Sequence, residues 1–185
     1  MALRNIVVSD DPILKKVCRP VVKFDDRLAQ LLEDMGETMR DAYGLGLAAP
    51  QVGVLRRLFV ALQENEDDEL WEEMSKRGEE PPSKILEFIN PEILEQKGEE
   101  LAYEGCLSYP GDYGAICRPT WVKVRAFDRN GKEFMMEAEG LMARCICHET
   151  NHLDGVTIED LADYFYDPDH PGELDEDYIE EEADR

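Results

Sequence analysis

The sequence has few of the residues on which several large classes of protein depend. Histidine occurs only three times in 185 residues, and the five cysteines are an odd number without the spacing of a disulfide framework. We therefore expect a reducing compartment, the cytoplasm, and no disulfide scaffold. Long apolar runs are also absent, and no basic and apolar leader opens the chain. The sequence thus predicts neither a membrane span nor a removed targeting segment.

Basic residues are scarce as well, because 20 Lys and Arg stand against 43 Asp and Glu, for a formal net charge of -23. Most of the excess lies in residues 63–80, with a net charge of -7, and in residues 159–185, with a net charge of -12. The rest of the chain is nearly neutral. Such acidic segments repel phosphate groups, so we expect no binding of nucleic acid or of anionic membranes.

What is present is enough apolar material for one folded domain, since 43% of the residues are hydrophobic. We predict a single catalytic domain over residues 1–165, with an acidic insertion at about 62–84. An acidic C-terminal tail is expected over residues 166–185. We find no internal repeat.

Periodicity and turn residues predict the main elements. After a loop-rich arm over residues 1–24, apolar residues at three- and four-residue steps predict a helix from Asp25 or Asp26 to Gly44. The small residues of segment 44–51 predict a turn. Asn130-Gly131 predicts a two-residue hairpin turn. Strands are expected at 58–61, 85–90, 122–126 and 132–138. This irregular order of strands and helices indicates the α+β class.

The most informative stretch is His148-Glu149-Thr150-Asn151-His152, near the end of a predicted helix that begins at about Glu139 and ends before Gly155. Residues four apart lie on one face of a helix, so His148 and His152 can bind a single metal ion. Glu149 is rotated off that line. Its carboxylate can therefore act as a general base without binding the metal.

Two ligands do not hold a catalytic metal, because such sites take three protein ligands and leave one position open. Ile158 stands where the metzincin pattern has its last histidine, and it cannot ligate. Cys145 shares the helical face but lies roughly 10 Å from His152 at about 1.5 Å per residue, so we expect it to pack. The candidates that remain open are Glu159, Asp160, Asp163, Cys18, Cys106, Cys117 and Cys147.

Three segments together resemble a known family. GLGLAAPQ at 44–51, EGCLS at 104–108 and HExxH at 148–152 occur in this order, at similar separations, in the peptide deformylases. The resemblance covers about residues 3–165. It implies an α+β fold in which antiparallel strands and hairpins surround a central metal-binding helix. It also implies metal-dependent removal of the N-formyl group from the formyl-methionine of nascent polypeptides, with release of formate.

The resemblance selects Cys106 as the third ligand beside His148 and His152. It further implies that the metal is Fe²⁺, which Zn²⁺, Ni²⁺ or Co²⁺ can replace. Two departures from the family pattern stand beside this triad. Asn151 occupies a position that is usually Asp, so we expect an altered contact behind the ligands, with weaker metal binding or a lower rate. Cys147 occupies a position often held by Gln, and we expect it to be buried.

The resemblance also assigns the catalytic groups around the metal. Glu149 would be the acid/base, and Gln51 with the backbone N–H of Leu107 would form the oxyanion hole. Gly46 would pair its backbone with the peptide substrate. Glu104 would support the metal ligands.

The implied partners are formyl-methionyl peptides, met in transient proximity to the ribosome. The acidic tail has the wrong charge to bind ribosomal RNA, and no membrane is expected. Two alternatives stay open at this point. One is another metallopeptidase or amide hydrolase with a downstream carboxylate ligand, and the other is a non-catalytic deformylase-like binding module.

Overall fold

Antiparallel strands form the framework of the molecule. The structure, a computed structural model, describes residues 2–63, 74–77 and 82–166. The strands within these residues are β1 (Gly46–Ala48), β2 (Leu58–Gln63), β3 (Lys84–Lys97), β4 (Glu100–Cys106), β5 (Tyr109–Arg118), β6 (Trp121–Phe127), β7 (Glu133–Glu139) and β8 (Tyr164–Phe165). They pair in two sheets, in the orders β1-β2-β3-β6-β7 and β4-β5-β8.

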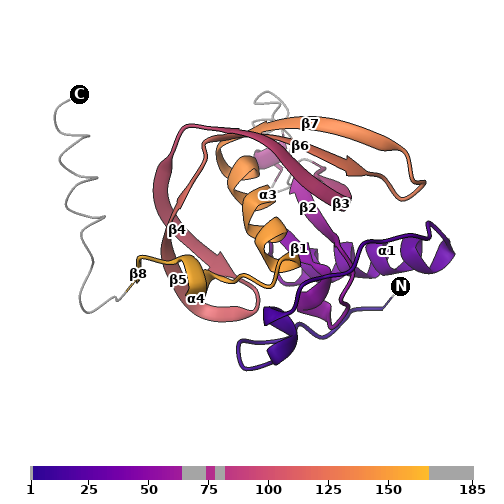
Figure 1. The fold of residues 1–185 in the computed structure, drawn as a ribbon, viewed down its shortest axis with the longest axis horizontal. Coiled ribbons are helices and arrows are strands. Elements are labelled where there is room, and N and C mark those ends of the chain that lie inside the picture. The colour runs from indigo at the N-terminus through magenta and orange to yellow at the C-terminus, as the bar shows by residue number, and fades with distance from the viewer. Residues whose placement is uncertain (1, 64–73, 78–81, 167–185) are drawn as a thin grey trace.

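The described helices are α1 (Asp26–Asp41), α3 (Gly140–Leu153) and α4 (Ile158–Leu161), with 3₁₀ turns at Pro12–Lys15 and Ala49–Val52. Figure 1 shows α3 in the middle of the molecule, with β4 and β5 on one side and β1 and β2 on the other. The predicted α+β class, with strands and hairpins around a central helix, is confirmed.

Helix α1 forms where the sequence predicted it, although it ends at Asp41, shortly before Gly44. The Asp25 side chain caps it by accepting a hydrogen bond from the Leu28 amide at 3.1 Å. Its apolar face packs against the sheet residues Leu58 and Val60. The buried apolar residues of α1 are Leu28, Leu31, Leu32, Met35 and Met39.

Helix α3 is anchored in the main core, although Leu141 in its first turn is exposed. Ala143, Ile146 and Leu153 are fully buried and belong to the cluster that contains Phe59 and Phe88. The helix ends before Gly155, whose φ of 74° favours glycine. A side chain there would also lie 2.7 Å from the Lys15 carbonyl oxygen. The polar face of α3 is thus held in a fixed position.

Segment 44–51 differs from the predicted turn. Gly46–Ala48 form β1, which pairs with β2 from Gly46↔Ala61 to Ala48↔Phe59. A pairing with a distant strand depends on tertiary structure, which a short run of small residues does not reveal. Since β1 is the edge of its sheet, one side of its backbone faces away from β2.

The β6–β7 hairpin corrects another prediction. Its strands are confirmed, and they pair from Trp121↔Glu139 to Phe127↔Glu133. The loop, however, holds three residues and not two, because the Asp128 amide donates to the Lys132 carbonyl at 2.9 Å. Gly131, with φ 76°, occupies the left-handed position that such three-residue loops require.

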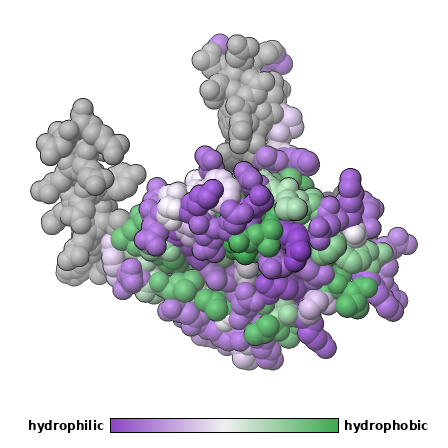
Figure 2. Space-filling model, turned by 45° about the horizontal axis from the view of Figure 1, so that its top comes forward, coloured by the Kyte–Doolittle hydropathy of each residue, from purple (hydrophilic) through white to green (hydrophobic). Residues whose placement is uncertain are grey.

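Much of the predicted acidic insertion and residues 167–185 of the predicted tail lie outside the described residues. None of the described helices has the length and apolar character needed to cross a bilayer. The face drawn in Figure 2 is mostly hydrophilic, with hydrophobic residues in small separate patches.

Candidate metal centre

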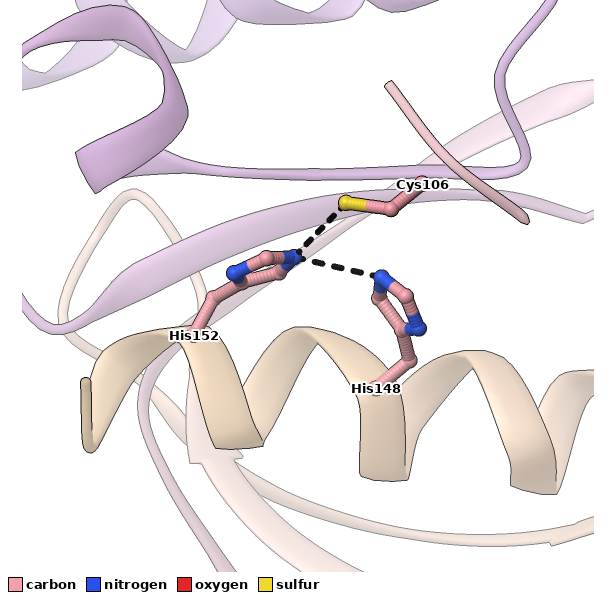
Figure 3. Close-up of side chains that lie close together, drawn as sticks. All are labelled: Cys106, His148 and His152. Carbon is pink, nitrogen blue, oxygen red and sulfur yellow. Dashed lines mark hydrogen bonds between the residues drawn. The ribbon is translucent and has the colours of Figure 1, made fainter. Parts of the chain in front are cut away.

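Three side chains of the kinds that bind transition metals converge between α3 and the end of β4 (Figure 3). His148 and His152 project from successive turns of α3, and Cys106 is the last residue of β4. The two Nε2 atoms are 3.1 Å apart, and Cys106 Sγ lies 3.3 Å from His152 Nε2. All three ligand atoms fall within 4.8 Å of one another. The helix places the histidines, whereas the tertiary fold brings up the thiol.

These distances fit one metal ion. Metal–nitrogen bonds of about 2.0–2.1 Å and a metal–sulfur bond of about 2.3 Å put the ligand atoms of a tetrahedron roughly 3.3–3.6 Å apart. The observed separations of 3.1 and 3.3 Å are close to this range. Two imidazoles and a thiolate suit a divalent transition metal, and three protein ligands leave a position open for chemistry. The triad is therefore suited to a catalytic ion.

The other candidate ligands do not join this cluster within the described residues. Glu159 accepts a hydrogen bond from the Tyr109 hydroxyl at 3.1 Å, and Asp160 pairs with Lys15 at 2.7 Å. Cys18 and Cys147 are buried thiols, whereas Cys117 is exposed. Cys145 is buried in the core cluster, and its thiol donates to the Leu45 carbonyl at 3.5 Å.

His148 is oriented from behind by Glu104. The Nδ1 atom of His148 lies 2.9 Å from Glu104 Oε2. Because a carboxylate accepts, Nδ1 carries a proton, and Nε2, which lies on the side of His152, is the nitrogen that would bind a metal. Burial acts to raise the pKa of Glu104, but hydrogen bonds from His148 and Arg118 outweigh it and hold this pKa at about 2. Glu104 is therefore ionised at neutral pH.

Two arginines that the sequence analysis did not identify hold Glu104 in place. Arg118 donates to Glu104 through Nε at 2.8 Å and through Nη2 at 2.9 Å. Arg144 donates to Glu104 Oε1 at 2.9 Å and to the Ile116 carbonyl at 2.9 Å. The position of Arg144, four residues before His148, could have suggested it. Arg118 stands on another strand and carried no local signal.

Asn151 contacts Arg118, which holds Glu104, and does not contact the three metal-ligand side chains. Its Oδ1 accepts a short hydrogen bond from Arg118 Nη1. The side chain is therefore directed away from the ligand atoms, as the helix geometry predicted. Cys147 is 5% exposed and packs in the main core, so its predicted burial is confirmed.

Glu149 lies beside the triad in a fully enclosed position. Glu149 is 4% exposed, and its Oε2 has no hydrogen-bond partner among the described residues. Burial raises the pKa of Glu149 to about 7, although the charge of His148 opposes the shift. A side chain on Gly46 would lie 2.4 Å from Glu149 Oε1, so the carboxylate occupies the space that glycine leaves free.

Gln51 faces the triad from the opposite wall. The Ala48 amide donates to Gln51 Oε1 at 2.8 Å, which turns the amide nitrogen toward the site. That nitrogen donates to Cys106 Sγ at 3.5 Å and to Ser108 Oγ at 3.2 Å. Leu107 follows directly after Cys106, and its side chain lies over Gly44.

A pocket of about 530 Å³ opens over this arrangement. Residues from the segment before β1, from the β4–β5 hairpin and from α3 line it. All the predicted site residues except His152 contribute to its wall, namely Gly46, Gln51, Cys106, Leu107, His148 and Glu149. The structure thus brings the predicted residues together around one cavity, with His152 beneath.

Comparison with known proteins relates this fold and site to one family. The sequence profile of the family described as "Polypeptide deformylase" matches residues 3–165. A peptide deformylase from Clostridium botulinum is 48% identical over 160 residues, which cover 86% of this chain and 97% of that protein. The crystal structure of peptide deformylase from Thermotoga maritima superimposes with a TM-score of 0.76 at 38% identity, and the match covers 89% of this chain and 100% of that one.

Proposed function

The chain belongs to the polypeptide deformylase family, and on that premise we propose that Cys106, His148 and His152 hold its metal ion and that Glu149 moves the proton. The protein is a hydrolase that removes the N-formyl group from the formyl-methionine of nascent polypeptides and releases formate. Bound in the triad, a divalent metal supplies Lewis acidity, which polarises a carbonyl oxygen and lowers the pKa of water.

The position of Glu149 carries this proposal. It follows His148 directly, and its Oε2 is buried without a partner among the described residues. A carboxylate placed in this way can accept a proton from the attacking water and later deliver it to the departing amine nitrogen. The C–N bond of the formamide then breaks, formate leaves, and the peptide keeps a free amino terminus.

The edge of β1 offers a line on which the peptide can dock. The Leu62 amide donates to the Leu45 carbonyl at 2.8 Å. Because hydrogen-bonding groups alternate sides along an antiparallel strand, the amide and carbonyl of Gly46 point away from β2. We infer that the substrate backbone pairs with Gly46 as an added strand. Since Gly46 lies against Glu149, the formyl end is held near the acid/base.

Gln51 and Leu107 supply the donors for the developing oxyanion. The Gln51 amide nitrogen is already turned toward Cys106 by the hydrogen bond from Ala48. The backbone N–H of Leu107 adjoins the same ligand in sequence. Donors fixed before the reaction stabilise charge that appears only in the transition state, and each is worth about 3–4 kcal/mol.

We propose Fe²⁺ as the native metal. The donor set suits Zn²⁺ equally well. The deformylases that the chain resembles nevertheless work characteristically with ferrous iron, and Zn²⁺, Ni²⁺ or Co²⁺ can take its place. Metal analysis of protein purified without oxygen tests this choice.

We further propose that the protein acts in the cytoplasm, where ribosomes produce formyl-methionyl chains. Residues 1–165 would form the single catalytic domain, and residues 166–185 the acidic tail. Proximity to the ribosome would be transient, because the charge of the tail opposes binding to RNA. Tail-dependent binding to ribosomal RNA at physiological salt would contradict this view.

Two substitutions test the assignment of the site. Glu149→Ala should keep its metal content and lose turnover by roughly 10²–10⁴-fold, because it lacks the acid/base. Cys106→Ala should lose the metal itself. Metal analysis and formate release, measured on the same preparations, separate the two effects. Activity of either variant equal to that of the parent would overturn the assignment.

A further inference from the structure

Glu104, which orients His148, has no acceptor capacity left. Its Oε1 accepts from Arg118 Nε at 2.8 Å and from Arg144 Nη1 at 2.9 Å. Its Oε2 accepts from Arg118 Nη2 and from His148 Nδ1, both at 2.9 Å. A carboxylate has about four acceptor positions. The two guanidinium groups therefore compete with His148 for the same carboxylate charge.

The charges of this cluster are not balanced. Arg118, Arg144 and Glu104 are all buried, so two positive charges face one negative charge. Arg144 has a second carboxylate partner in Glu100 at 3.3 Å, but that side chain is 54% exposed. The other partner of Arg118 is Asn151, which accepts a hydrogen bond without adding charge. Among the described residues, Glu104 is therefore the carboxylate to which Arg118 donates, although the charge of Arg118 also lowers the pKa of the nearby Glu149.

We propose that Asn151 sets the strength of metal binding in this protein, because it holds Arg118 in place as a neutral acceptor and so leaves a more weakly held, more exchangeable ion than Asp would. The inference rests on the triad assigned above. It goes further by making residue 151 a positioning residue that acts on the metal through Arg118, Glu104 and His148.

The physical reason lies in the hydrogen bond between His148 and Glu104. A carboxylate behind a ligating imidazole raises its basicity and thereby its affinity for the metal. When Arg118 draws fully on Glu104, less negative charge remains for the His148 N–H. A second carboxylate at position 151 would share the guanidinium charge and restore that effect. Its negative charge would also offset the surplus positive charge near a bound cation.

The isosteric substitution Asn151→Asp tests the inference. Zinc affinity is measured in full-length protein by competition with a chromophoric chelator, and zinc release is followed after addition of excess EDTA. We expect Asn151→Asp to bind Zn²⁺ roughly 10–100-fold more tightly than the parent, the range typical of groups that support metal ligands. Most of the change should appear as slower release.

Two control variants separate charge from contact. Asn130→Asp adds the same charge at the loop between β6 and β7, far from the middle of α3 in Figure 1, and should leave zinc affinity unchanged. Asn151→Ser keeps the site neutral but shortens the side chain that holds Arg118. It should bind zinc no more tightly than the parent. The absorption of the Co²⁺-loaded proteins reports whether the thiolate and imidazole ligands are the same in each.

Zinc affinity of Asn151→Asp within twofold of the parent, or weaker, would overturn the inference. Equal tightening by Asn130→Asp or by Asn151→Ser would also overturn it, because neither restores a carboxylate beside Arg118. If Asn151→Asp does not fold, tighter binding by Asn151→Ser alone decides against the inference. Formate release by the parent is measured separately, so failure of the proposed function is distinguished from failure of this inference.

Discussion

Replacement of Gly46 by alanine is expected to remove most of the activity without touching a metal ligand. The added Cβ would lie 2.4 Å from Glu149 Oε1 and 2.7 Å from its Cγ and Cδ. The pairing of β1 with β2 fixes one side of this contact and the buried face of α3 fixes the other, so the carboxylate must move. Loss of a positioned acid/base lowers the rate by roughly 10²–10⁴-fold.

The assay is formate release from formyl-Met-Ala-Ser, with metal content and thermal unfolding measured on the same samples. We expect kcat to fall while the bound metal per chain stays that of the parent. Overpacking at Gly46 should lower the stability by about 1–3 kcal/mol. A raised KM with unchanged kcat would instead indicate that the alanine obstructs peptide binding.

The double variant Gly46→Ala/Glu149→Ala provides the matched control. Without the Glu149 carboxylate, the alanine at position 46 has room. The double variant should therefore be about as stable and about as slow as Glu149→Ala alone, which is the non-additivity expected of groups in contact. Full activity of Gly46→Ala, or additive losses in the double variant, would refute the reasoning.

The remaining predictions concern the oxyanion donors and Asp34 of α1, which holds the N-terminal arm through Ala2 and Arg4. Gln51→Leu removes the amide donor at similar size and should lower kcat by roughly 10²–10³-fold with little change in metal content, as steady-state kinetics and metal analysis will test. For Asp34, burial acts to raise the pKa, but hydrogen bonds from Gln30 and Ala2 outweigh it and hold the pKa below its usual value. A lowered folded-state pKa gives stability that is present above the unfolded pKa of about 3.9 and lost as the pH falls through the folded value. Asp34→Asn should therefore lower the free energy of unfolding at pH 7 by about 1 kcal/mol, and this difference from the parent should shrink below about pH 4. Thermal unfolding measured across this pH range tests it, and a pH-independent difference would contradict it.

Local patterns were sufficient for the parts of the site that lie on one element. His148 and His152 are four residues apart on one helix, so their convergence follows from helix geometry. The same geometry turned Glu149 off the ligand line and Asn151 away from the ligands. The buried face of α1 followed equally from the spacing of its apolar residues.

Groups from separate elements could not be derived in this way. The spacing of residues left seven candidates open for the third ligand, and only the resemblance to a family selected Cys106. Arg118 reaches Glu104 across the β4–β5 hairpin, although the strand register places it opposite Glu100, and no short motif in the sequence indicates this contact. The strand β1 was missed for the same reason, since its partner β2 lies beyond an intervening turn.

The β6–β7 loop illustrates a different limit. Asn130-Gly131 correctly indicated a hairpin, but the pair of residues fits more than one loop length. The hydrogen bond between Asp128 and Lys132 decides the length, and it depends on where each strand stops pairing. The sequence predicted the connection but not its register.

The most direct test of the central claim is the product analysis of formyl-Met-Ala-Ser incubated with iron-loaded, anaerobically purified protein, beside Glu149→Ala with the same metal content. We predict equal molar release of formate and of intact Met-Ala-Ser by the parent, and almost none by Glu149→Ala. Absence of formate from the fully metallated parent would contradict the account. Cleavage of the internal peptide bonds would contradict it as well, because it would identify a metallopeptidase instead.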